Sequence, residues 1–128
     1  MPKPIVPRPT EGELSILQVL WSRGPSTVRN VHEALYPNRG TGYTTTLKLL
    51  QIMIAKGLVL RDVSDRSHVY RAKFTEDQTQ RRVVHDLLDR TFGGSAQKLV
   101  LHALSLKKAS PQELAEIKKF LDELEGKS

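Results

Sequence analysis

One stretch of the chain, GYTTTLKLLQIMIAKG at residues 42–57, carries several polar side chains close together. Thr44, Thr45, Lys48 and Gln51 offer two hydroxyls, one cation and one amide, and the stretch contains no acidic residue. In the major groove of DNA, hydroxyl and amide side chains pair with base edges and phosphates, and a threonine methyl can pack on the thymine methyl. The set therefore indicates recognition of duplex DNA.

Helical periodicity must bring these side chains onto one face. Leu47, Leu50 and Ile54 fall within about 60° of one another on a helical wheel, so we expect a helix over residues 43–56 with these three side chains facing a core. The four polar side chains then lie on the outward face, while Thr46 points toward a neighbouring helix. The alternative is that the first threonine only caps the helix and the rest of the face is solvated.

Two shorter helices should precede this one. The stretch TEGE at residues 10–13 has the capping-box pattern and begins a first helix. Its apolar side chains face the core: Leu14, Leu17, Leu20 and Trp21. Ser26 can cap a second helix, which the turn YPNRG at residues 36–40 ends. The apolar positions of this second helix are Val28, Val31 and Leu35.

A β-hairpin should follow the third helix. The stretches LVLRDV (58–63) and HVYRA (68–72) have strand composition, and SDRS (64–67) joins them as a turn. Three short helices followed by a hairpin are the layout of a winged helix-turn-helix, so the expected fold is mainly α with a small β-hairpin wing. Candidate DNA contacts come from the third helix, the second helix and the wing: Tyr43, Thr44, Thr45, Lys48, Gln51, Thr27, Arg29, Arg66 and Arg71.

The excess of positive charge is confined to this first part of the chain. Residues 1–73 hold 11 Lys and Arg against 5 Asp and Glu, whereas residues 74–128 hold nine of each, so the whole net charge of +6 lies in the first part. A basic part joined to a neutral part suggests that one binds a polyanion and the other has a different task. We therefore expect a flexible N-terminal arm (1–9), a winged-helix DNA-binding domain (10–73) and a helical dimerisation domain (74–128).

Three helices are expected in residues 74–128. The first begins at TEDQ (75–78) and ends near residues 92–94, the second covers roughly 95–106, and the third begins at SPQE (110–113). Since about 55 residues of helix are hard to stabilise as a free-standing domain, we expect two chains to share this core. The apolar residues expected to form the dimer contact, the last four of them with coiled-coil spacing, are Val84, Leu87, Leu88, Leu114, Ile117, Leu121 and Leu124.

The composition argues against several other classes of protein. Without cysteine there is no disulfide and no thiolate metal site, and the four histidines lack metal-ligand spacing. No serine lies in a nucleophile motif and no glycine-rich loop has phosphate-binding spacing, so we expect neither an enzyme nor a cofactor. With neither a membrane-spanning run nor a signal peptide, a cytoplasmic protein is the plain expectation.

Taken together, these motifs resemble the penicillinase-repressor family of bacterial winged-helix transcriptional repressors. The resemblance extends from about Thr10 to Leu124. It rests on ELSILQVLW in the first helix, VRNVHEAL in the second and YTTTLKLLQ in the third. It continues through KGLV, the wing DRSHVYRA, the stretch FGGSAQKLVLHAL and a final helix of mixed acidic and basic residues.

The resemblance implies a homodimer bound to an operator with dyad symmetry, and repression of β-lactamase or other resistance genes. It also implies release when a membrane-bound sensor metalloprotease leads to cleavage in the dimerisation domain. Relatives are cut at an Asn-Phe pair after a run like that at residues 98–101, whereas the matching pair here is His102-Ala103. We therefore expect a protease of different specificity or another signal. Copper-responsive relatives carry a cysteine-rich site that this chain lacks.

A second reading is a winged-helix module for protein–protein assembly with an incidental basic face. A protein interface needs an aromatic or aliphatic anchor, and the expected outward face has none at its centre. The DNA-binding repressor is therefore the favoured reading.

Overall fold

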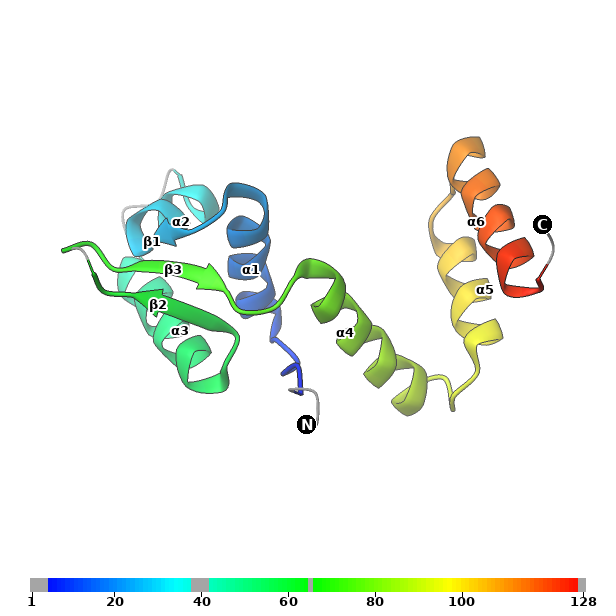
Figure 1. Ribbon diagram of the computed structural model, residues 1–128, viewed down its shortest axis with the longest axis horizontal. Coiled ribbons are helices and arrows are strands. Elements are labelled where there is room, and N and C mark those ends of the chain that lie inside the picture. Colours follow the sequence, from blue (N-terminus) through cyan, green and yellow to red (C-terminus); the bar gives the residue numbers. More distant parts are fainter. Residues whose placement is uncertain (1–4, 38–41, 65, 127–128) are drawn as a thin grey trace. The chain divides into compact units, whose positions relative to one another are not determined.

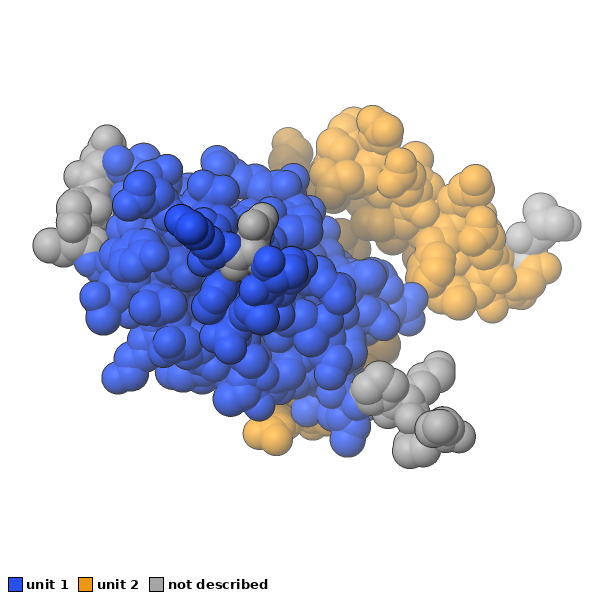
Figure 2. Space-filling model, turned by 60° about the vertical axis from the view of Figure 1, so that its left-hand side comes forward, with its two compact units in different colours: residues 1–85 blue, residues 86–128 orange. Residues whose placement is uncertain are grey.

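The chain divides into two compact units, residues 1–85 and residues 86–128, which Figure 2 colours separately. The computed structural model describes residues 5–37, 42–64 and 66–126. Parts of the expected N-terminal arm, of the turn at 36–40 and of the wing turn at 64–67 therefore lie outside the described residues. Within the described ranges, no helix is long and apolar enough to cross a membrane.

The first unit contains three complete helices, the first turns of a fourth and a small antiparallel sheet (Figure 1). Its elements are α1 (Glu11–Arg23), β1 (Ser26–Thr27), α2 (Val28–Leu35), α3 (Tyr43–Lys56), β2 (Val59–Asp62) and β3 (Val69–Ala72). The sheet order is β1-β3-β2, with Val59 opposite Ala72 and Ser26 opposite Tyr70. The expected winged helix-turn-helix is confirmed, and β1 is an additional edge strand that the sequence did not predict.

The helices of the first unit form around one core. Thr10 and Glu13 make the expected capping box at the start of α1. The fully buried apolar side chains come from the three helices, from the sheet and, in Leu58, from the residue before β2: Ile16, Leu17, Val31, Leu50, Met53, Leu58, Val59 and Tyr70. The predicted inward face of α1 needs a correction, because Leu14 and Trp21 are only half-buried while Ile16 and Val19 are buried. Apolar residues at every turn of α1 left its rotation ambiguous in the sequence.

The cap of α2 also differs from the prediction. The hydroxyl of Thr27 accepts the backbone N–H of Asn30 at 3.1 Å, so Thr27 is the N-cap residue. Ser26, the predicted cap, is buried in β1, and its hydroxyl donates to the carbonyl of Gly24 at 2.9 Å. Pairing of β1 with β3 holds Thr27 as well as Ser26 in extended backbone, so Val28 is the first helical residue and Thr27 takes the N-cap position.

The helix α4 (Glu76–Arg90) contains the boundary between the two compact units, which falls between His85 and Asp86. The expected domain boundary lay after Lys73. The first turns of α4 belong with the first unit because Phe74 and Thr79 are buried there. The indole N–H of Trp21 also donates to the carbonyl of Phe74 at 3.0 Å and ties the end of the sheet to α1.

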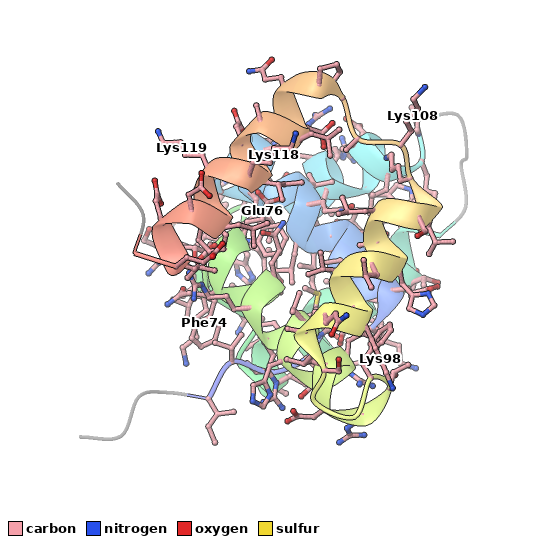
Figure 3. All side chains as sticks on the ribbon, turned by 90° about the vertical axis from the view of Figure 1, so that its right-hand side faces the viewer. Phe74, Glu76, Lys98, Lys108, Lys118 and Lys119 are labelled. Atoms are coloured by element: carbon pink, nitrogen blue, oxygen red, sulfur yellow. The ribbon has the colours of Figure 1, made fainter. Side chains whose placement is uncertain are left out.

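The second unit holds α5 (Ala96–Leu106) and α6 (Pro111–Leu124), which begin at the N-cap residues Ser95 and Ser110. The hydroxyl of Ser95 accepts the backbone N–H of Lys98, and Ser110 forms the expected capping box with Glu113. No described residue from Asp86 onward is buried. Figure 3 shows the side chains of these helices as sticks, including Lys98 of α5 and Lys119 of α6.

Candidate nucleic-acid interface

The polar face of α3 is exposed, as its residue pattern predicts. Thr44, Thr45, Lys48 and Gln51 are all exposed on the helix that follows the turn of the helix-turn-helix. The exposed Ile52 adjoins this face, and the sequence reasoning missed it. A short apolar side chain in the major groove can pack on a thymine methyl, as a threonine methyl can.

The N-terminus of α3 favours the binding of an anion. Its N-cap is Gly42, with φ +100°, and no described side chain caps the helix there. Thr44 is therefore not a cap, which removes the alternative reading of that residue. The first N–H groups of a helix have no partner within it, and the helix dipole adds partial positive charge at the same end. With no acid in the first turn, this end of α3 suits a phosphate.

The inward face of α3 is rotated slightly from the prediction. Thr46, Leu50 and Met53 are its buried residues, whereas Leu47 and Ile54 are half-buried at the edge of the core. The expectation that Thr46 turns toward a neighbouring helix is confirmed, since its hydroxyl lies 3.0 Å from Nδ1 of His32 in α2.

A partly buried ion pair joins the other end of α3 to α1. Nζ of Lys56 lies 2.6 Å from Oε1 of Glu13, and the Glu13 side chain is only 2% exposed. Burial pushes the pKa of Glu13 upward, but hydrogen bonds from Lys56 and Thr10, together with the charge of Lys56, outweigh it and hold the pKa below its ordinary value of 4.5. The pair anchors the last turn of α3 to the first turn of α1.

The wing presents two arginines. Arg66 is exposed in the connection between β2 and β3. Arg71 is exposed on β3, while the preceding residue, Tyr70, points to the other face of the strand and is buried in the core. Asp62 accepts the backbone N–H of Ser64 at 2.9 Å, and this hydrogen bond, with the nearby charge of Arg71, lowers the pKa of Asp62. A carboxylate therefore lies near Arg71 and compensates part of its charge.

Two other predicted contacts lie at the start of α2. Arg29 is exposed, while Thr27 is half-buried and uses its hydroxyl oxygen as the helix cap. The structure thus gives Thr27 a structural task that the sequence reasoning did not assign to it.

The residues expected at the dimer contact present apolar surface. Leu88 and Ile117 are half-buried in the single chain. The others are exposed, and these are Val84, Leu87, Leu114, Leu121 and Leu124. The pair His102-Ala103 lies in α5 with both side chains exposed, and the ring of His102 contacts Phe92 at a centroid distance of 5.6 Å.

A winged helix-turn-helix that presents an exposed, acid-free polar helix is the architecture of a DNA-binding transcriptional regulator. The chain belongs to the penicillinase repressor family, because the sequence model of that family matches residues 9–123.

Two relatives by sequence agree with this assignment. The chain is 35% identical over 116 residues to the transcriptional regulator BlaI of Mycobacterium tuberculosis, covering 89% of this chain and 83% of the relative. It is 24% identical over 118 residues to the penicillinase repressor of Bacillus licheniformis, covering 92% of each. Among solved structures, it is similar to a MarR family protein from Bacillus stearothermophilus, with 21% identity, a TM-score of 0.49, and coverage of 92% of this chain and 74% of that one.

Proposed function

We propose that this protein is a homodimeric repressor that binds a dyad-symmetric operator by placing α3 in the major groove. The observation that carries the proposal is the exposed polar face of α3, held at one end by the pair Lys56–Glu13. Thr44, Thr45, Lys48 and Gln51 would reach base edges and adjacent phosphates, as this set of donors and acceptors allows. Arg66 in the wing and Arg29 in α2 would contact phosphates on either side, with Tyr43, Thr27 and Arg71 as supporting contacts.

The dimer is supported by the exposed apolar residues of the second unit. Leu101, Leu106, Phe120, Leu121 and Leu124 are each at least half exposed in a single chain. Soluble proteins rarely leave so much apolar helix surface in water unless a partner covers it. A second copy of the same chain would cover these helices and present two copies of α3 to half-sites one helical turn apart, about 34 Å.

Release of the repressor would follow loss of the shared core. A cut in α5 would remove apolar contacts from both chains at once, so one nick could dissociate the dimer from DNA. Because His102-Ala103 offers no large aromatic after the scissile bond, we propose that a protease of different specificity or another signal acts here, not the cleavage by which a membrane sensor system releases relatives. Cells exposed to a β-lactam should keep the protein at full mass, and rapid cleavage at His102-Ala103 would contradict this.

Binding to a promoter fragment at several salt concentrations tests the DNA-binding proposal. If the basic first unit neutralises phosphates, the logarithm of the binding constant should fall linearly with the logarithm of salt concentration, by about 0.9 per phosphate contacted. A response that is flat with salt would count against DNA as the partner. The same fragment with its sequence scrambled, at each salt concentration, separates specific binding from general attraction to a polyanion.

A further inference from the structure

A histidine in α2 lies in the angle between α2 and α3. The side chain of His32 is only 8% exposed. Its ring contacts Tyr36, at a centroid distance of 5.4 Å, and Tyr43, at 5.8 Å. These tyrosines stand at the two ends of the connection between the helices, the first as the C-cap of α2 and the second as the first residue of α3. His32 therefore bridges the ends of the helix-turn-helix connection.

Hydrogen bonds extend this bridge into the first turn of α3. Nδ1 of His32 lies 3.0 Å from the hydroxyl of Thr46, and that hydroxyl donates to the carbonyl of Gly42 at 3.3 Å. Nδ1 of His32 and the Thr46 hydroxyl therefore share one hydrogen bond, and the imidazole tautomer decides which of the two groups donates. His32 thus fixes Thr46, which in turn fixes the N-cap backbone.

The N-cap itself is fitted to the imidazole ring. Gly42 has φ +100°, and a Cβ added there would meet Cε1 of His32 at 3.5 Å. That distance is an ordinary van der Waals contact, so the ring of His32 lies beside the N-cap and leaves space for a Cβ. Glycine is favoured at this position because positive φ strains residues that carry a side chain.

We infer that His32 is a positioning residue for DNA reading: it sets the place and rotation of the first turn of α3, and with them Tyr43, Thr44 and Thr45. This inference rests on the proposed function. Recognition groups must be held within about half an ångström of their working geometry by partners whose own positions are locked. His32 meets this condition, because burial, the ring contact with Tyr36 and the hydrogen bond with Thr46 hold it, while the side chains it positions are exposed.

Two substitutions remove the hydrogen bond between His32 and Thr46 while a side chain of similar shape still fills the site. His32→Phe keeps an aromatic ring but has no ring nitrogen to hydrogen-bond Thr46, and Thr46→Val keeps the branched shape but has no hydroxyl. Thr46→Ser is the matched control, since it retains the hydroxyl. Binding is measured on a duplex selected by the wild-type protein from a randomised library and on a scrambled version of it. The temperature is kept well below unfolding, as verified by circular dichroism for every variant.

His32→Phe and Thr46→Val should each weaken binding to the selected duplex about ten-fold, the equivalent of one good hydrogen bond, and leave binding to the scrambled duplex within about two-fold. Thr46→Ser should bind like the wild type. The double variant should be no weaker than either single variant by more than about two-fold, because both remove the same link. Equal losses on both duplexes, or no loss in the folded single variants, would overturn the inference while the repressor proposal stood.

Hydrogen exchange in the free protein separates this inference from the function on which it rests. The backbone N–H of Thr46 donates to Gly42 in the first turn, at 3.0 Å. In His32→Phe this amide should exchange faster than in the wild type, whereas the amides of Leu50 and Met53 should keep their wild-type rates. Unchanged exchange at Thr46 would overturn positioning by His32 whether or not the protein binds DNA. A wild type that selects no sequence would instead contradict the proposed function.

Discussion

Oε1 of Glu13 and Nζ of Lys56 lie 2.6 Å apart and join the first turn of α1 to the last turn of α3. The same oxygen of Glu13 makes the ion pair with Lys56 and accepts the backbone N–H of Thr10 at 2.8 Å. A residue that looks like part of a simple helix cap is therefore also the anchor of the helix proposed to read DNA. His32 and the N-cap Gly42 hold the opposite end of that helix.

Lys56→Met should destabilise the first unit, because it leaves the carboxylate of Glu13 buried without its cation while it keeps the length of the side chain. Unfolding in urea should show a loss of about 1–3 kcal/mol, which is below the range of about 3–5 kcal/mol for a fully buried pair because Lys56 is partly in solvent. Lys48→Met on the exposed face of the same helix is the control, with an expected change within about 0.5 kcal/mol. Equal effects of the two substitutions would show that the pair contributes nothing.

Acid should weaken the fold through the same pair. The folded-state pKa of Glu13 is below its ordinary value of 4.5, so its stabilising effect is complete above that value and is lost as pH falls through the folded-state pKa. Urea unfolding from about pH 5 to about pH 3 should therefore show a smaller loss of stability in Glu13→Gln than in the wild type. The exposed Glu11, in the same turn, provides the matched Glu11→Gln variant, which should follow the wild-type curve.

The two kinds of DNA contact should be separable by substitution. Thr45→Ala and Lys48→Ala should weaken binding to the operator by about 1–3 kcal/mol more than binding to scrambled DNA, as base contacts do. Arg66→Ala should weaken binding to all sequences nearly equally, because a phosphate contact carries no sequence information. Competition between the two duplexes distinguishes these outcomes. If all three variants lost both kinds of binding alike, the assignment of base reading to this face of α3 would be wrong.

Leu121→Asp should disrupt the dimer, because it would place an unpaired carboxylate in the proposed contact between chains. Sedimentation should show a dimer for the wild type and a monomer or unfolded protein for the variant. Lys119→Asp, on the opposite side of α6 by helical periodicity, is the control and should remain dimeric. A wild type that stays monomeric at high concentration would contradict the proposed architecture.

Local sequence signals predicted the elements well, and long-range contacts explain most of what they missed. The capping boxes at Thr10 and Ser110 are complete within four residues, so both helix starts could be read directly. The choice between Ser26 and Thr27 as cap could not, because both are good caps and the pairing of β1 with β3 decides between them. The additional strand is only two residues long and leaves no pattern in the sequence.

The candidate site likewise has features that the local sequence predicts and features that only long-range contacts determine. The exposure of Thr44, Lys48 and Gln51 follows from helical periodicity alone. The two supports of α3 do not, because Lys56 meets a carboxylate 43 residues earlier and Thr46 meets a histidine 14 residues earlier. A lone histidine in a helix gives no signal of its own, so only the fold identifies His32 as part of the site.

The decisive test of sequence-specific DNA binding through α3 is the selection of duplexes from a randomised library by the wild-type protein. A dimer that reads DNA with α3 should enrich an inverted repeat whose half-site centres are one helical turn apart, about 34 Å, or a multiple of that spacing. The selected duplex should bind two chains, and the repeat should be lost when selection is repeated with Thr45→Ala/Lys48→Ala. If the wild type enriches no sequence over the starting library while it remains folded and binds DNA only in general, sequence-specific repression through α3 is contradicted.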